Sequence, residues 1–163
     1  MSNLLKKLNP LFFMKKRPLV PVVRLTGVIG VGTPLRPGLS LSGVSDVLER
    51  AFSMAREAVA IQINSPGGSA AQSHLIFRYI RDLAREKSVR VYTFAEDVAA
   101  SGGYMIACAG DEIYADPSSI VGSVGVLYAG FGFTKLMETI GVERRVHTAG
   151  ERKMMLDAFQ PEN

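Results

Sequence analysis

The sequence is poor in the residues that build disulfide frameworks and metal sites. Its 163 residues include one cysteine, two histidines and no tryptophan. A single cysteine excludes an internal disulfide, and one cysteine with two histidines gives no recognisable zinc spacing. We therefore expect no bound metal, and no motif indicates a cofactor. Because 47% of the residues are hydrophobic, intrinsic disorder is excluded and a core formed by packing alone is expected.

Long hydrophobic runs are also missing near the start of the chain. The longest one there, Leu11–Met14, is far shorter than the apolar part of a signal peptide or the ~20 residues of a membrane span. A cytoplasmic location in a reducing compartment is the default that follows.

Basic residues are in excess only at the N-terminal end. Five of them lie in the first 17 residues, which contain no acidic residue, and without these five 14 basic residues face 15 acidic ones. The net charge of +4 therefore belongs to this end, and nucleic-acid binding is not expected. We expect residues 1–18 to form a basic, flexible tail. The leucines and phenylalanines between its lysines would suit peripheral contact with the inner membrane.

Strand and helix patterns alternate along the rest of the chain. From Val44 to Ala55 apolar residues recur at the spacing of an amphipathic helix, whereas Ala58–Ile63 is a short β-branched run typical of a buried strand. The other predicted strands are Leu19–Leu25, Val28–Val31, Val89–Ala95, Glu112–Ala115, Val124–Leu127 and Val142–His147, and the other predicted helices are Ser69–Leu83, Ser101–Ala109 and Thr134–Ile140. This alternation predicts an α/β fold with parallel strands joined by right-handed crossovers.

Two glycine-rich turns follow successive predicted strands, at Asn64–Ser69 and Ala100–Tyr104. Open α/β sheets place ligands at this end of their strands, and the helix after each turn presents unpaired N–H groups. Taken alone, each turn is best explained as an ordinary strand-to-helix turn. Ser69, in a capping-box pattern with Gln72, and Ser101 would then be N-caps. Together the turns favour a site, because one N–H group from each could form an oxyanion hole.

Ser101 has the setting of a nucleophile, because an alanine and two glycines flank its small side chain at the start of a predicted helix. A serine nucleophile needs a base. His74 lies on the helix after the first turn and His147 ends a predicted strand, so both are weak candidates. Lysine can serve if burial lowers its pKa from ~10.4. Of the two lysines after Ser101, Lys135 has the pattern of a solvated helix face, whereas Lys153 precedes three apolar residues.

Four motifs along the chain resemble, in order, those of the S49 peptidases, the signal peptide peptidase A family. They are Asn64–Gly68, Ala100–Tyr104, Gly122–Val126 and Gly150–Lys153. The resemblance runs from about Val20 to the end of the chain. It includes the 52-residue separation of Ser101 and Lys153 found in the single-domain members. Any one motif alone would be weak, but the ordered set is specific.

The resemblance implies both a fold and a site. The implied fold of residues 19–163 is the ClpP/crotonase type, a spiral of ββα units. The implied activity is a serine endopeptidase that hydrolyses peptide bonds in hydrophobic or remnant signal peptides, in a ring-like homo-oligomer whose serine and lysine come from neighbouring protomers. The implied residues are Ser101 as nucleophile, Lys153 as base, Ser123 to orient the lysine, Gly68 and Gly102 as oxyanion donors, and Gly67 and Gly103 in substrate binding.

The sequence departs from the family pattern at both ends. Members often carry an N-terminal membrane anchor, where this chain has only the basic tail, and the family domain continues beyond Asn163, so we expect the domain to be truncated at its C-terminal end. Two alternatives stay open: a crotonase-type acyl-CoA enzyme and a non-catalytic, membrane-associated scaffold. Outside the motifs, we expect Cys108 in the core, and Asp97 and Asp111 as solvated charges at helix ends.

Overall fold

The computed structural model describes residues 19–30, 32, 38–125, 129–147, 149 and 157–160. Contacts divide the chain into two units, Met1–Val126 and Leu127–Asn163. The predicted tail and Lys153 lie outside the described residues.

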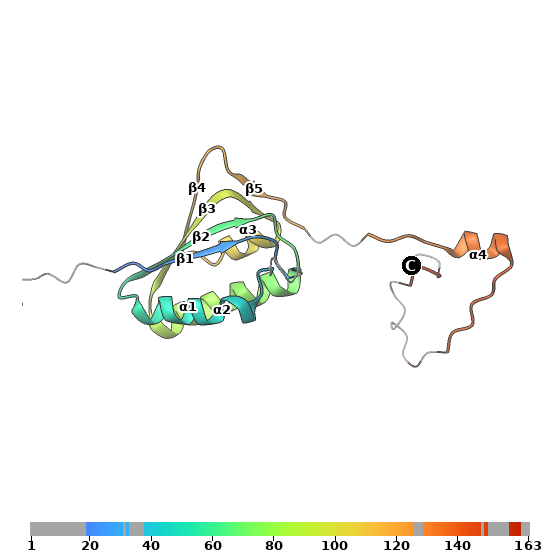
Figure 1. The fold of residues 1–163 in the computed structure, drawn as a ribbon, viewed down its shortest axis with the longest axis horizontal. Coiled ribbons are helices and arrows are strands. Elements are labelled where there is room, and N and C mark those ends of the chain that lie inside the picture. Colours follow the sequence, from blue (N-terminus) through green and yellow to red (C-terminus); the bar gives the residue numbers. More distant parts are fainter. Residues whose placement is uncertain are drawn as a thin grey trace, which may run out of the picture. The chain divides into compact units, whose positions relative to one another are not determined.

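The first unit is built on a parallel sheet, drawn in Figure 1. In its described part the strands are β1 (Val22–Thr26), β2 (Ala58–Ser65), β3 (Arg90–Ala100), β4 (Glu112–Ala115) and β5 (Ile120–Gly122). They pair in the order β1-β2-β3-β4, and β5 pairs with β3 beyond the end of β4. Every pairing is parallel, so the predicted α/β class with a mainly parallel sheet is confirmed.

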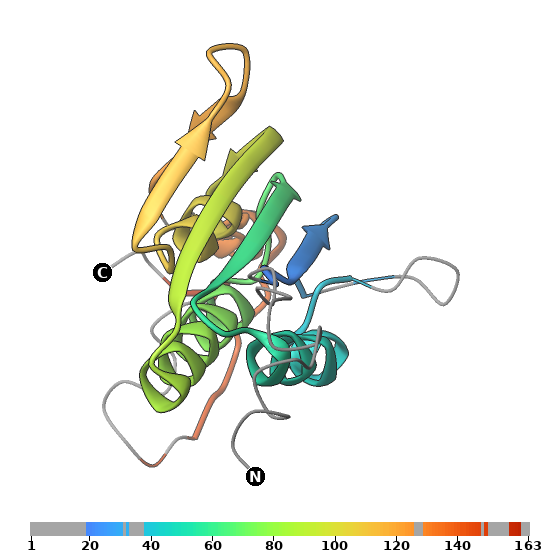
Figure 2. The same cartoon turned by 90° about the vertical axis from the view of Figure 1, so that its left-hand side faces the viewer.

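Three helices of the first unit pack against this sheet. They are α1 (Leu41–Met54), α2 (Ala70–Lys87) and the short α3 (Gly102–Ala107). Figure 2 shows α1 and α2 side by side along the sheet. The capping box predicted at the start of α2 is only half formed. The Ser69 side chain accepts from the Gln72 N–H group, but the Gln72 side-chain oxygen accepts from the Leu41 N–H group, 2.9 Å away, and so joins the starts of two helices.

The core lies between the helices and one face of the sheet. Alternate side chains of β1, β2 and β3 point into it, as the burial pattern of β1 shows most simply. Its largest inaccessible side chains include Leu25, Leu48, Phe52, Ile61, Ile63, Ile76, Ile80 and Ile106. The other face of the sheet carries Tyr92 and Phe94, whose rings both contact the ring of Tyr114.

The second unit is described only in part. Its helix α4 spans Thr134–Ile140, as predicted, and none of that helix's side chains is buried in the described structure. Phe133 stacks on Phe159, and Arg144 pairs with Asp157 and lies over the same Phe159 ring.

Several element predictions need correction. Residues 142–147 have no regular structure. Of the strand predicted at Val124–Leu127, Val124 and Gly125 are not in a strand and the other two residues lie outside the described part; the last strand described is Ile120–Gly122. Val28–Val31 was expected as a strand, but within the described residues only Ile29 bridges, to Leu39 and Gly68. Cys108 is exposed at the end of α3, so its predicted place in the core is wrong. No helix in the described residues is long and apolar enough to cross a membrane.

Candidate active site

The two glycine turns meet at the carboxyl end of the sheet. The strand register places Ser65 of β2 opposite Ala99 of β3, so both strands end at the same level and the two turns follow there. A Cβ atom added to Gly67 would lie 2.8 Å from the Ser101 Cβ, the Ala100 oxygen and the Gly102 nitrogen. The turns are therefore in direct contact, and only glycine fits at position 67.

The second turn is packed just as closely against α2 and the end of β2. A Cβ atom on Gly102 would lie 2.1 Å from the Ser73 hydroxyl, and one on Gly103 would lie 2.6 Å from the Ser65 carbonyl oxygen. Both glycines are buried. The lack of side chains at Gly102 and Gly103 thus lets α3 start directly against α2 and β2. A role for Gly67 and Gly103 in substrate binding stays a prediction.

Ser101 occupies an unusual backbone conformation between β3 and α3. Its φ is +52° and its ψ is −117°, a region that non-glycine residues rarely adopt. Its N–H group donates to the Gly122 oxygen of β5 at 2.8 Å, and its carbonyl accepts from Met105 at 3.0 Å. The side chain does not cap α3, and its hydroxyl has no hydrogen-bond partner among the described residues. The N-cap interpretation is confirmed for Ser69 and wrong for Ser101, whose hydroxyl is left available.

The amide of Gly68 is directed away from the neighbouring Val28–Gly30 segment. The Gly67 carbonyl accepts from the Ile29 N–H group at 2.9 Å, and the Ser69 N–H group donates to the Ile29 oxygen at 2.8 Å. In a trans peptide the C=O and N–H bonds point in opposite directions, so the Gly68 N–H group points to the side away from Ile29. In the described structure it has no acceptor, and Gly68 is exposed.

The amide of Gly102 is oriented by the same geometry. The Ser101 carbonyl points along α3 toward Met105, so the N–H group of Gly102 points out of the start of the helix. The first N–H groups of a helix have no partner within it, and no acceptor from the described residues reaches this one. The two predicted oxyanion donors thus lie on turns that touch, and neither amide has an acceptor within the part of the chain described.

Ser123 lies beside Ser101, one residue beyond β5. The register pairs Ala100 with Gly122, which places the next residues of both strands side by side. Ser123 is exposed and also has a positive φ, +54°. The structure therefore brings Ser101, Ser123, Gly68 and Gly102 to one end of the sheet. The position of Lys153 relative to them falls outside the described residues.

The remaining titratable candidates have structural partners or face solvent. Asp97 accepts a hydrogen bond from the Asn64 side chain at 2.8 Å, and Asp111 accepts from Arg81 and from the Val91 N–H group. The backbone hydrogen bond from Val91, with the Arg81 guanidinium, holds the pKa of Asp111 below its ordinary value. The prediction that Asp111 is a solvated charge is therefore wrong, because its carboxylate is paired with Arg81 and the Val91 amide. His74 and Lys135 are exposed, as predicted.

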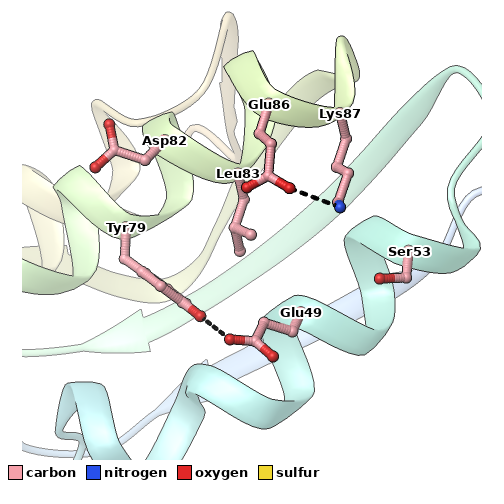
Figure 3. A pocket seen from close by; sticks show the side chains of 7 residues that line it. All are labelled: Glu49, Ser53, Tyr79, Asp82, Leu83, Glu86 and Lys87. Atoms are coloured by element: carbon pink, nitrogen blue, oxygen red, sulfur yellow. Dashed lines mark hydrogen bonds and ion pairs between the residues drawn. The ribbon is translucent and has the colours of Figure 1, made fainter.

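A pocket of about 370 Å³ lies elsewhere, between the second halves of α1 and α2 (Figure 3). Its lining includes Glu49, which accepts a hydrogen bond from the Tyr79 hydroxyl. That hydrogen bond is the main cause that raises the pKa of Tyr79 to about 12. The pocket lies toward the ends of α1 and α2 that lead into β2 and β3, so it is near the amino ends of these strands, whereas Ser101 follows the carboxyl end of β3. No group of acidic, histidine or cysteine side chains that could hold a metal ion occurs in the part of the chain described.

Sequence reasoning missed one residue of this region, Ser65. Its side chain has no accessible surface, and its hydroxyl donates to the Gly27 oxygen at 2.6 Å and accepts from the Gly67 N–H group at 3.1 Å. A signal was present, because Ser65 continues the buried positions of Val59, Ile61 and Ile63 along β2. A hydroxyl at a core position has to be satisfied by hydrogen bonds.

Fold and site together define an α/β protein with a strained serine beside two backbone amides that have no acceptor among the described residues. Comparison with known proteins agrees, because the model of the family described as Peptidase family S49 matches residues 83–163. The chain belongs to this family, as its motifs predicted.

Three similar proteins illustrate the relationship. Na(+)/H(+) antiporter NhaA of Brucella melitensis is 60% identical over 99% of this chain and 22% of its own length. Serine protease SPPA, chloroplastic, of Arabidopsis thaliana is 41% identical over 63% of this chain and 15% of its own length. Among solved structures, a mutant of the 1510-N membrane-bound stomatin-specific protease has a TM-score of 0.53 at 22% identity, over 71% of this chain and 51% of that one. This likeness supports the predicted ClpP/crotonase-type fold.

The chain spans less than a quarter of the length of both of these relatives known by sequence. The antiporter name describes a whole protein of which 22% corresponds to this chain. The family match therefore concerns this domain, and what the whole protein does is a matter for proposal.

Proposed function

We propose that this domain carries the nucleophile of a serine endopeptidase with a Ser101/Lys153 dyad. The observation that carries the proposal is the strained backbone of Ser101, which leaves its hydroxyl unpaired among the described residues beside the free amides of Gly68 and Gly102. Strained conformations of this kind cluster at active sites. Two amides on touching turns are the arrangement that stabilises an oxyanion.

The proposed reaction has two steps. Neutral Lys153 removes the proton from the Ser101 hydroxyl as its oxygen attacks the peptide carbonyl carbon, and the oxyanion accepts hydrogen bonds from Gly68 and Gly102. The C–N bond then breaks, the amine leaves with the proton from Lys153, and an acyl-enzyme remains. Water, activated by Lys153, hydrolyses it. Lys153 can act as base only if an apolar environment lowers its pKa, and we assign Ser123 to orient its amine.

The substrates, partners and location belong to the same proposal. Hydrophobic peptides, including remnant signal peptides, are the substrate class that the family resemblance implies. We propose a homo-oligomer in which Lys153 of one protomer serves Ser101 of its neighbour. We place the protein at the cytoplasmic side of the inner membrane, with the tail of residues 1–18 in peripheral contact. The neighbour described as a membrane-bound protease is in keeping with this location.

Activity-based labelling tests the dyad in the protein expressed from its native gene. A phosphonate that reacts with activated serines should modify Ser101, and Ser101→Ala and Lys153→Ala should each lower kcat for peptide hydrolysis by a factor on the order of 10⁴. The matched controls are Ser53→Ala, an exposed serine of α1, and Lys135→Ala, an exposed lysine of α4. Both should keep full activity.

Three results would contradict the proposal. Full hydrolysis by Ser101→Ala would exclude the dyad. Tight binding of coenzyme A by a wild-type protein that neither hydrolyses peptides nor reacts with the phosphonate would support the crotonase-type alternative instead. A wild-type protein with none of these activities would support the scaffold alternative.

A further inference from the structure

The first glycine turn is held in place by a buried hydroxyl. Ser65 stands at the end of β2, where the strand's inward-facing positions are otherwise aliphatic. Burying a hydroxyl without partners costs free energy, so a serine here is explained only by what it bonds. Its two partners are backbone groups: the Gly27 oxygen, in the segment beside the turn, and the Gly67 N–H group, within the turn itself.

These two hydrogen bonds fix the peptide that presents Gly68. Gly67 is pinned on both sides, because its N–H group donates to the Ser65 hydroxyl and its carbonyl accepts from Ile29. With both groups held, the φ of +95° at Gly67 is determined, and the direction of the Gly68 N–H group follows from the trans peptide.

The same hydroxyl also holds the segment that supplies the Ile29 N–H group. The Gly27 carbonyl accepts from Ser65, and the Gly27 N–H group donates to the Asn64 oxygen at 2.9 Å. Gly27 leads directly into Ile29, which bonds both Gly67 and Ser69. Ser65 therefore joins the Asn64–Ser69 turn, and the Gly27–Ile29 segment that supports it, to the end of β2.

We propose that Ser65 is a positioning residue of the oxyanion hole, which acts by holding the Gly67–Gly68 peptide so that the Gly68 N–H group faces the substrate carbonyl. This inference rests on the proposed function. Without the hydroxyl, the buried Gly67 N–H group and the Gly27 carbonyl lose their partner. Glycine populates positive and negative φ about equally, so the turn can relieve this by rotating Gly67, which redirects the neighbouring peptide.

The test is Ser65→Ala in the protein expressed from its native gene, with Thr93→Val as the matched control. Thr93 is also fully buried, and its hydroxyl donates to the Ala107 oxygen at 2.8 Å, away from both turns. Each variant removes one buried hydroxyl, so losses of stability should be similar. Ser65→Ala alone should lower kcat about 10- to 100-fold with KM changed less than about twofold, because the lost contact is made to the oxyanion and not to the bound substrate.

A peptide aldehyde gives a second readout that a merely structural role would not move. Its hemiacetal oxygen occupies the oxyanion position, so its affinity should fall by the same factor as kcat/KM in Ser65→Ala and stay unchanged in Thr93→Val. If Ser65→Ala does not fold, Ser65→Cys serves in its place, since a thiol keeps a weak donor and acceptor. We expect an intermediate loss of kcat for that variant.

The outcomes separate this inference from the proposed function. A folded Ser65→Ala protein with wild-type kcat, or equal losses of kcat in Ser65→Ala and Thr93→Val, would overturn the positioning role. A wild-type protein without hydrolysis or labelling would overturn the proposed function itself. Amide hydrogen exchange at Gly67 reports on the hydrogen bond without any activity, and exchange that is no faster in Ser65→Ala than in wild type would overturn the role of Ser65 in holding the turn.

Discussion

The two units of the chain differ in how they bury their apolar side chains. In the unit Met1–Val126 the strands and helices share a core whose members, such as Phe52 and Ile61, are almost fully inaccessible. In the described part of the unit Leu127–Asn163, the apolar side chains of α4 remain exposed, with Leu136 at 54% and Ile140 at 62%. The turns around Ser101 are thus supported by a core within their own unit, whereas no side chain of α4 is buried among the described residues.

The largest expected effect separates the two units by core truncation. Phe52→Ala should lower the free energy of unfolding by about 3–5 kcal/mol, because it removes a buried ring and leaves a cavity. Leu136→Ala in α4 should change it by less than about 0.5 kcal/mol, as exposed substitutions usually do. Urea unfolding followed by circular dichroism measures both. Comparable losses of unfolding free energy in the two variants would show that Leu136 is buried in solution, and the two units would then not differ in how they bury apolar side chains.

A smaller effect is expected from glycines that differ in their surroundings. Gly102→Ala brings a methyl group to 2.1 Å from the Ser73 hydroxyl and should cost about 1–3 kcal/mol. Gly132→Ala in the second unit meets no atom within 4 Å and should be neutral or slightly stabilising. Both are measured by urea unfolding.

A double mutant sharpens this comparison. Removing the hydroxyl with Ser73→Ala relieves the closest contact of Gly102→Ala, although the Ser73 Cβ still lies 3.1 Å from the new methyl position. The loss of unfolding free energy in the double variant should therefore be smaller than the sum of the two single losses by at least about 0.5 kcal/mol. Strict additivity would mean that this contact is not the source of the cost.

The sequence predicted best those elements whose cause is local. The helix α1 and the start of α2 follow from apolar periodicity and from the cap at Ser69, and α4 was placed at Thr134–Ile140. The strand β5 was not predicted, and it pairs with Val98–Ala100, the part of β3 that continues past the register shift between Ile63 and Ser65. Residues 142–147, in which only Val142 and Val146 are β-branched, have no described partner strand and form no strand.

The candidate site was predictable in its members and not in its geometry. The glycine turns and Ser101 were visible as motifs, since small residues at strand ends are a local signal. The positive φ of Ser101 depends on its hydrogen bond to Gly122, and the role of Ser65 depends on Gly27, 38 residues away. Contacts between segments so distant in sequence are set by the assembled sheet.

The smallest expected effect concerns one Arg–Asp pair in each unit, Arg81–Asp111 and Arg144–Asp157. In both, hydrogen bonds to the carboxylate keep the pKa of the aspartate below its ordinary value, mainly from the Val91 amide for Asp111 and from the arginine for Asp157. A carboxyl whose pKa is lowered by folding stabilises the folded state above its unfolded pKa of about 3.9, and that contribution is lost as the pH falls through the folded pKa.

Asp111→Asn should therefore cost about 1 kcal/mol at pH 7, since the carboxylate is partly exposed, and the difference from wild type should shrink as the pH falls below about 4. Asp157→Asn should leave the main unfolding transition unchanged at every pH, because its unit contributes no described residue to the core. Urea unfolding at a series of pH values measures both. A difference between Asp111→Asn and wild type that grows toward acid pH would reverse the sign of this linkage. It would show that Asp111 is stabilised in its protonated form, against the geometry of its hydrogen bonds to Val91 and Arg81.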